Sequence, residues 1–350
     1  MPAPSLTLAT LTAPSKDWDD FVRARAHASV YLLGGWAQLG QDVFGHPAYF
    51  IEGRNESGAL AGVLPLVRQK SLLFGDSLTS VPFFNYGGAL ADTIEHTQAL
   101  MEQARSLALS LGCRYLEFRD TRELPGDWRV RTDKVTLLLD LPESFEVLAK
   151  KLGAKLRSQV KRAEREKHAV RVGGRELLGD FYTVFAHNMR DLGTPVYPLR
   201  FFEAIFDRFA GYCQIVVIDG DAGPSAAGFL IIANGRAEIP WAACLPEAKR
   251  LGFNMKLYWE VLSAVMRRGC SVFDFGRSTV DAGTYKFKLQ WGAAPRQLYW
   301  HRWERKAAAA QPEAPAREGR LMHYATTVWK RLPLPVANRL GPLVSGSLPW

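Results

Sequence analysis

Two stretches of this chain decide its fold: LGCRYLEFRD at residues 111–120 and RGCSVFDFGR at residues 268–277. In both, Gly-Cys is followed by an apolar pair, an acid and a Phe in the same register. Two earlier stretches also match, AGVLPLV at 61–67 and AGFLIIA at 227–233, and each follows a short apolar run and a polar turn, which predicts a hairpin. An amphipathic helical pattern precedes the later strand in both copies. A hairpin, a helix and a buried strand, in that order and twice, predict two copies of one α/β domain.

The composition limits the class of protein. A chain of 350 residues is long enough for two domains with separate cores. Its 47% hydrophobic and 23% charged content is typical of soluble globular proteins, and no apolar run approaches the 18 residues of a membrane span. The first twelve residues lack a signal-peptide pattern. The four cysteines form no CxxC pair, so we expect reduced, buried thiols in a cytoplasmic protein without a metal site.

The apolar periodicity predicts an α/β (α+β) fold with mixed sheets flanked by helices. Helices are predicted at residues 17–44, 94–111, 143–168, 176–191, 199–209 and 255–268. Strands are predicted in the hairpin 48–69 and at 113–118, 134–141, 212–219, 227–233, 236–243, 271–276 and 297–303. The predicted domains are 1–141 and 142–305, followed by an Ala/Pro-rich linker at 306–320 and an amphipathic tail at 321–350.

Much of the net charge of +9 lies in one segment. Nine Lys/Arg and two Glu fall between Lys150 and Arg171, which gives 9 − 2 = +7. The predicted basic helix at 143–168 would bind a polyanion: a nucleotide-sugar pyrophosphate, a tRNA or an anionic membrane surface. A solvated helix face is the alternative, but the acids are too few for i, i+4 pairing. The candidate phosphate-binding residues are Lys155, Arg157 and Lys161.

The segment 271–292 is the strongest candidate for chemistry. A buried strand ends in an acid and an Arg, and a loop then brings two lysines among aromatic residues. Ionisable groups at strand ends in α/β sheets are typical of ligand sites. The alternative is that the acid caps a turn while the lysines extend over the aromatic rings. The candidates are Asp274, Arg277, Lys286, Lys288 and Trp291.

A second candidate is the turn KRLGFNMK at 249–256, which opens a helix. Free N–H groups at a helix N-terminus bind phosphate, and Asn254 lies there; the alternative is that Asn254 caps the helix. P-loop, HExxH and GxSxG motifs are absent from the sequence, which argues against nucleotide hydrolysis, zinc catalysis and serine-hydrolase chemistry.

Several motifs resemble the FemAB family, in particular its members associated with PEP-CTERM/exosortase systems. The likeness covers about residues 5–305. It is carried by Gly45-His46-Pro47, GVLPLV at 62–67, SVPFFNYGG at 80–88, KLRSQVKRAEREKHAVRV at 155–172, LGFNMKLYWE at 251–260, FDFGRS at 273–278 and FKLQWG at 287–292.

The resemblance implies two tandem GNAT-like (acetyltransferase-type) domains. It implies transfer of an acyl or aminoacyl group to an amine of a cell-envelope or exopolysaccharide precursor, with acyl-CoA or aminoacyl-tRNA as a donor that is not tightly bound. In the family the Lys of the FK-x-x-[FW]-G motif lies at the reaction centre, and here that residue is Lys288. The chain departs from tRNA-using members that carry a long coiled-coil arm, which argues against a tRNA donor.

These considerations predict the following roles. Lys288 stabilises the developing oxyanion, and Asp274 either orients Lys288 or Arg277 or accepts the proton of the amine. The phosphates bind at Lys155, Arg157 and Lys161, and Asn85 and Tyr86 line the acceptor groove. The remaining predicted substrate-binding residues are Trp241, Asn254, Arg277, Lys286 and Trp291.

The two copies also differ. The first ends its strand in Glu117-Phe118-Arg119 with no Lys-aromatic cluster after it, so we expect the chemistry in the second copy. Two other classes remain open. One is a non-catalytic envelope-assembly adaptor that docks on an anionic membrane or on partner proteins through its basic helix and tail; the other is a tRNA-binding protein. The predicted location is the cytoplasm, at the inner face of the membrane.

Overall fold

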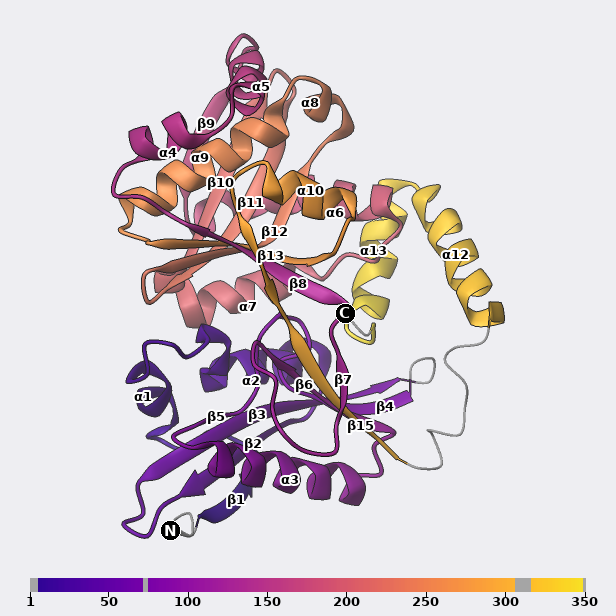
Figure 1. The fold of residues 1–350 in the computed structure, drawn as a ribbon. Helices are drawn as coiled ribbons and strands as arrows, with labels where there is room; N and C mark the ends of the chain where they lie inside the picture. Colours follow the sequence, from indigo (N-terminus) through magenta and orange to yellow (C-terminus); the bar gives the residue numbers. More distant parts are fainter. Residues whose placement is uncertain (1–5, 72–74, 306–315, 349–350) are drawn as a thin grey trace. The chain divides into compact units, whose positions relative to one another are not determined.

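The computed structural model of the chain describes residues 6–71, 75–305 and 316–348. These residues form two compact units (Figure 1). Unit 1 comprises Met1–Lys134, Gln297–Pro315 and Gly346–Trp350, and unit 2 comprises Val135–Arg296 and Ala316–Ser345. Each unit is built around its own mixed sheet, as the duplicated motifs predict.

Unit 1 contains an eight-stranded sheet. Its strands follow the order β1 (Thr7–Leu11), β2 (Ala48–Arg54), β3 (Leu60–Ser71), β4 (Gly75–Thr79), β6 (Tyr115–Asp120), β15 (Tyr299–Glu304) and β7 (Arg129–Arg131), with β5 (Leu90–Ala91) paired to β3. The pairs are antiparallel except for β4 and β6, which are parallel because helix α3 (Ile94–Ser110) lies between them in the sequence. Leu100 and Met101 of α3 pack on one face of the sheet. Helices α1 (Trp18–Arg23) and α2 (Gly34–Phe44) lie on the other face (Figure 1), and Trp18 of α1 meets Phe50 of β2 edge-on with ring centroids 5.2 Å apart.

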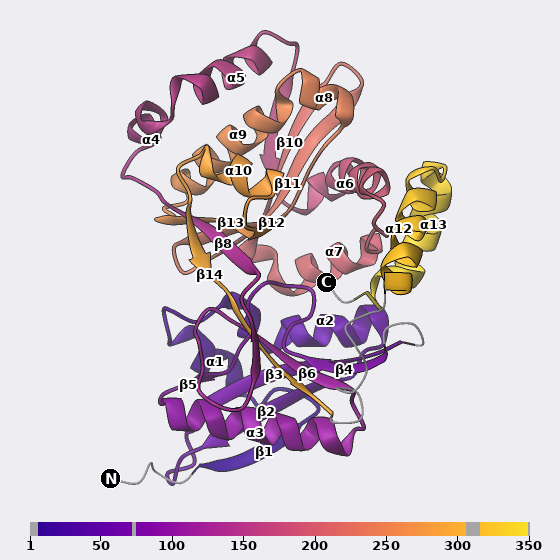
Figure 2. The same cartoon turned by 45° about the vertical axis from the view of Figure 1, so that its right-hand side comes forward.

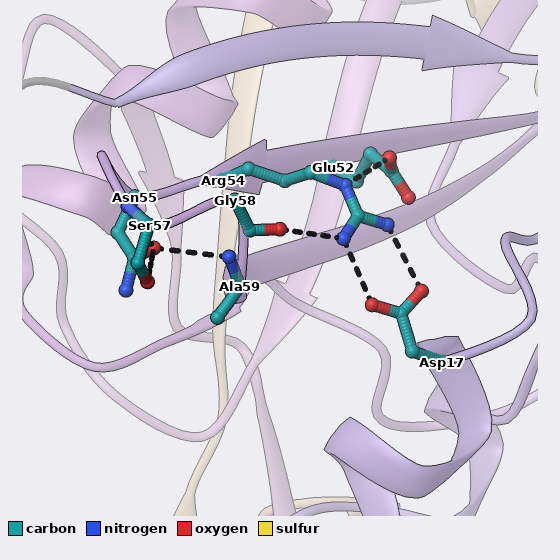
Figure 3. A network of polar contacts seen from close by, with 7 residues as sticks. All are labelled: Asp17, Glu52, Arg54, Asn55, Ser57, Gly58 and Ala59. Carbon is teal, nitrogen blue, oxygen red and sulfur yellow. Dashed lines mark hydrogen bonds and ion pairs between the residues drawn. The ribbon is translucent and has the colours of Figure 1, made fainter.

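A polar network fixes the β2–β3 turn in unit 1 (Figure 3). The guanidinium of Arg54 donates two hydrogen bonds of 2.8 and 2.9 Å to Asp17, which caps helix α1, and others to Glu52 and to the carbonyl of Gly58. The Asn55 side chain accepts backbone N–H groups across the turn. The bond from Arg54 lowers the pKa of Asp17 to about 2, so this link between hairpin and helix persists well below neutral pH.

Unit 2 repeats this architecture with a seven-stranded sheet. Its strands follow the order β9 (Ala169–Gly173), β10 (Cys213–Gly220), β11 (Gly223–Ala233), β12 (Arg236–Cys244), β13 (Val272–Thr279), β8 (Lys134–Asp140) and β14 (Ala294–Gln297). As in unit 1, an antiparallel hairpin leads to a strand that pairs in parallel with the strand after the helix, here α9 (Phe253–Arg267). The duplication predicted from the sequence is therefore a duplication of topology.

Helices cover both faces of the second sheet (Figure 2). One face packs on α4 (Phe145–Lys151), α5 (Ala154–Glu164), α8 (Pro246–Arg250), α9 and α10 (Gly283–Leu289). The other face packs on α6 (Leu178–Leu192) and α7 (Leu199–Phe209), whose phenylalanines meet Phe229 of β11 and Trp241 of β12. Two C-terminal helices, α12 (Ala316–Lys330) and α13 (Leu334–Ser345), pack against α6.

The structure differs from the predicted domain boundaries at two strands. Strand β8 falls in the predicted domain 1–141 but lies in the sheet of unit 2. Strand β15 falls in the predicted domain 142–305 but lies in the sheet of unit 1. In each sheet the contributed strand occupies the same place, next to β6 or β13. The two copies have therefore exchanged one strand, which the local sequence pattern does not reveal.

Three other elements differ from the prediction. The single basic helix expected at 143–168 is two helices, because Leu152 and Gly153 adopt extended backbone conformations between α4 and α5. Helix α12 begins at Ala316, inside the expected linker, whose residues 306–315 lie outside the described part of the chain. The tail contains two helices, because the chain turns at Pro333 and resumes as α13.

Candidate active site

The sheet of unit 2 opens beside Asp274. Strands β12 and β13 pair in parallel over three residues only, and the last pair joins Glu238 to Asp274. Beyond it, the β11–β12 register shifts opposite Pro240, which has no N–H group to donate. Such a bulge bends a strand, and here β12 follows β11 to Cys244 while its pairing with β13 ends. The diverging strands leave backbone groups of β12 and β13 unpaired with each other.

Asp274 is buried at this opening, with an exposed fraction of 3%. Its Oδ1 accepts a hydrogen bond of 2.6 Å from the Thr136 hydroxyl on β8 and one of 2.8 Å from the backbone N–H of Gly276. Gly276 has φ of 74°, a left-handed conformation that favours glycine. The carboxylate therefore joins two strands and fixes the turn of backbone that follows it.

Lys288 reaches the same backbone from α10. Its ammonium group donates to the carbonyl oxygens of Gly276 at 2.8 Å and Arg277 at 3.0 Å, and the residue is 7% exposed. An ammonium group has three N–H donors, so one donor of Lys288 has no acceptor in the described part of the chain. The geometry thus holds a cation rigidly while leaving one N–H for a ligand.

Burial lowers the pKa of Lys288 from 10.5 to about 8, and the negative charges of Asp274 and Glu238 oppose this shift. The unfolded state therefore binds this proton more tightly than the folded state. The resulting stability cost is fully present below pH 8 and disappears as the pH rises from about 8 to 10.5. The folded protein retains a buried ammonium group at neutral pH at the expense of some stability.

Aromatic rings surround the lysine-bearing segment. Tyr258 of α9 stacks on Phe275 with ring centroids 5.6 Å apart and meets Phe287 edge-on at 5.0 Å. Trp291 is completely buried next to them, and its indole N–H has no partner within the described residues. These rings pack the segment that carries Lys288 against α9 and β13.

The structure brings together residues that the sequence analysis missed. Glu238 is 8% exposed and lies directly across from Asp274 on the same face of the sheet. Ser278 is 4% exposed on β13, and its hydroxyl has no partner in the described chain. The isolated acid in the apolar stretch AEIPWAAC at 237–244 was the available signal for Glu238. Only the strand register reveals its neighbour.

The other candidates on 271–292 lie at the edge of this cluster. Arg277 is half-buried on β13, and Lys286 is exposed on α10. Trp241, by contrast, packs with Phe201, Phe202 and Phe229 under α6 and α7. Its size is therefore accounted for by core packing.

The basic-helix candidates divide in two. Lys155 and Lys161 are exposed on α5, whereas Arg157 donates to the carbonyl oxygens of Lys150 and Leu152 at the C-terminal end of α4. Arg157 therefore joins the two helices. The cap of α9 is Gly252, with φ of 91°, so the interpretation of Asn254 as the capping residue is wrong.

In unit 1, Asn85 and Tyr86 are the partly exposed residues of an otherwise buried loop at 78–90. Arg119 holds this loop, since its guanidinium donates to the carbonyl oxygens of Pro82 at 2.6 Å and Phe84 at 2.9 Å. Arg119 is 4% exposed and occupies the place in LGCRYLEFRD that Gly276 occupies in the second copy. A large buried side chain thus stands in unit 1 where unit 2 has none.

Two further properties concern the described residues only. Among them, no group of three or more His, Cys, Asp or Glu side chains is placed to hold a metal ion. No helix in the same ranges has both the length and the apolar character needed to cross a bilayer.

Comparison with known proteins identifies the fold. Residues 150–289 match the family model described as an acetyltransferase (GNAT) domain. Among solved structures, the chain is similar to FemX (TM-score 0.65, 14% identity, 83% of this chain and 96% of that one). It is also similar to L-PGS from Bacillus licheniformis (TM-score 0.55, 14% identity, 91% of this chain and 98% of that one). A third similar structure is a tandem GNAT protein from the clavulanic acid biosynthesis pathway (TM-score 0.55, 12% identity, 86% of this chain and 98% of that one). None of the curated protein sequences matches this chain.

The likeness to these structures confirms the predicted fold, and the similarity to FemX is consistent with the FemAB-like resemblance. The matched model covers α5, α9, β13 and α10, and therefore Asp274 and Lys288. A domain of this type supports an acyl- or aminoacyltransferase. Residues 150–289 match an acetyltransferase domain of the GNAT type, and the chain has the fold of two such domains in tandem.

Proposed function

We propose that the chain transfers an acyl or aminoacyl group from a thioester or ester donor to an amine of a cell-envelope or exopolysaccharide precursor. One observation carries the proposal: in the GNAT-type domain, the buried ammonium of Lys288 is held by two backbone carbonyls beside the opening between β12 and β13. Its third N–H is the donor that an oxyanion requires.

In the proposed step, the amine nitrogen attacks the donor carbonyl carbon and a C–N bond forms. The carbonyl oxygen becomes negatively charged and accepts a hydrogen bond from Lys288. The carbon–sulfur or carbon–oxygen bond then breaks, and the leaving thiolate or alkoxide takes the proton that the amine loses. Because Oδ1 of Asp274 accepts from Thr136 and Gly276, we assign Asp274 to positioning the backbone that holds Lys288.

The difference between the two copies supports a single catalytic centre. In unit 1 the last β4–β6 pair joins Thr79 to Glu117, in the same way as Glu238 and Asp274 in unit 2. Beyond that pair, the side chain of Arg119 occupies the space and bonds to the 80–88 loop. Gly276 stands at the corresponding position of unit 2. In unit 1, Asn85 and Tyr86 are the proposed acceptor-binding residues.

We expect the transfer rate to fall as pH rises through about 8, because deprotonation of Lys288 removes both its charge and its donor. The measurement is kcat against pH between 6.5 and 10 under saturating substrates. Lys288→Arg is the matched control, since an Arg does not titrate in this range. If kcat of Lys288→Arg falls at alkaline pH in the same way as kcat of the original chain, the titrating group is not Lys288.

The donor is tested by thermal shift. A ligand that binds only the native state raises the melting temperature, by the equivalent of about 2.7 kcal/mol at 100 times its Kd. The panel is acetyl-CoA, longer acyl-CoAs, charged tRNA and nucleotide-sugar precursors. We expect one donor class to raise Tm, and Lys155→Gln with Lys161→Gln to reduce the shift. The control variant Lys16→Gln with Lys70→Gln replaces two other exposed lysines and should leave the shift in Tm unchanged.

The same panel can refute the proposal. If no donor raises Tm and no N-acylated product forms with any amine acceptor, the transferase assignment is wrong. The cellular setting is part of the proposal: a cytoplasmic protein at the inner face of the membrane, associated with a PEP-CTERM/exosortase system. The FemAB-like motifs, such as SVPFFNYGG at 80–88 and FKLQWG at 287–292, support this setting.

A further inference from the structure

Helix α13 packs on unit 2 through its small residues. Ala337, Gly341 and Ser345 recur at intervals of four and are buried. A Cβ atom on Gly341 would lie 2.9 Å from the backbone nitrogen of Val196, so the helix approaches the α6–α7 connection closely. The inward face of α13 therefore has no room for large side chains.

The large apolar residues of α13 lie on its outer face. Val336, Leu340 and Leu343 follow an i, i+4, i+7 pattern and are 42%, 41% and 77% exposed. Leu343 is the most exposed large hydrophobic residue in the described chain. An amphipathic helix that packs only against its own domain would have the opposite arrangement, because burial of a Leu side chain stabilises by about 2 kcal/mol.

Helix α12 lies beside α13 (Figures 1 and 2) and also has exposed apolar residues. Tyr324 and Val328, one helical turn apart, are 69% and 43% exposed. The helix is held to α6, since the side chain of Thr326 fills the space beside Gly193 and the guanidinium of Arg190 donates to the carbonyl of Leu332 at 3.1 Å. Tyr324 and Val328 are therefore exposed on a helix that is packed against unit 2.

The charge around the exposed apolar residues is mainly positive, although Glu318 lies in the first turn of α12. Lys330, Arg331 and Arg339 are exposed on or beside the two helices. Residues 319–350 contain no Asp or Glu. Exposed apolar side chains flanked mainly by cations complement an anionic, partly apolar surface.

We propose that the outer faces of α12 and α13 dock on an anionic lipid bilayer. We call this the tail surface; it consists of Tyr324, Val328, Lys330, Arg331, Val336, Arg339, Leu340 and Leu343. The apolar side chains enter the boundary between headgroups and acyl chains, Tyr324 lies at headgroup level, and the cations bind lipid phosphates. The inference does not depend on the proposed transfer activity.

The test is co-sedimentation of the full chain with vesicles. We expect binding to phosphatidylcholine vesicles containing 30% phosphatidylglycerol, and at least tenfold weaker binding to phosphatidylcholine alone. The apolar triple variant Val336→Gln, Leu340→Gln, Leu343→Gln should lower partitioning at least tenfold. The charge variant Lys330→Gln, Arg331→Gln, Arg339→Gln should lower it by about 100-fold, at about fivefold per cation.

A matched control distinguishes binding through the tail surface from non-specific binding of any exposed apolar residue to vesicles. Ile94→Gln, Leu109→Gln and Val172→Gln replace three exposed apolar residues elsewhere, 41%, 47% and 40% exposed, and this variant should bind vesicles like the original chain. Absence of binding to the anionic vesicles, or an equal loss in the control, overturns the proposal. A dimer in sedimentation velocity that the apolar triple variant converts to monomer also overturns it, because the surface would then belong to a second copy.

Discussion

Replacing Lys288 by Met should reduce kcat for transfer by on the order of 10²–10³, the effect of removing one oxyanion donor. Met preserves most of the side-chain volume while removing the ammonium group. The carbonyls of Gly276 and Arg277 lose their donor, which costs about 1–3 kcal/mol each where they stay dry. Removing a poorly solvated charge offsets part of that cost. The fold should therefore survive while the activity falls.

Lys286→Met is the matched control for this experiment. Lys286 lies two residues away on the same helix, but it is exposed. We expect it to affect KM at most, with kcat within about twofold of the original. Circular dichroism and Tm establish that both variants are folded. If Lys288→Met keeps full kcat in a folded protein, Lys288 is not the oxyanion donor and the proposed mechanism is wrong.

Replacing Asp274 by Ala should have the largest effect on stability, about 3–5 kcal/mol lost from the free energy of unfolding. The change removes the acceptor Oδ1 of Asp274 from the Thr136 hydroxyl and the Gly276 N–H, and it leaves Glu238 as the remaining negative charge near the ammonium of Lys288. Urea unfolding with an unchanged slope measures the effect. Thr136→Val removes one of these bonds and should cost about 1 kcal/mol.

Asp274→Asn distinguishes positioning from proton transfer. The amide oxygen can still accept from Thr136 and Gly276, but the larger of the two negative-charge contributions that raise the pKa of Lys288 is gone, and only that of Glu238 remains. We expect near-native stability and an alkaline limb of the rate profile that moves below pH 8. A kcat loss as large as that of Lys288→Met, with the limb unmoved, would contradict the positioning role and make Asp274 the base.

Much of the architecture could be predicted from the sequence because it depends on local patterns. The hairpin, helix and strand of each copy follow from apolar periodicity and from Gly-Cys at the strand entry. The same patterns placed Asp274 at a strand end and Lys288 among aromatic residues. The break at Leu152 and Gly153 was missed because both helices keep the same apolar stripe.

The candidate site could be predicted only where the sequence concentrates chemistry in one segment. Glu238 lies 36 residues before Asp274 in the sequence and becomes its neighbour through the parallel register of β12 and β13. The shortage of acidic residues near Arg157 predicts a cation available for phosphate. In the structure its partners are backbone carbonyl oxygens at the end of α4. Such partners have no signature in the sequence.

By itself, then, the sequence determined that one α/β unit occurs twice and that the second copy carries the lysine and the acid. The tertiary structure decided which sheet receives β8 and which receives β15, because an alternating or apolar run specifies a strand but not its partner. It also decided that the buried side chain of Arg119 holds the 80–88 loop in unit 1, at the position where unit 2 has Gly276 with φ of 74°. Both depend on contacts between residues far apart in the chain, which local propensity does not encode.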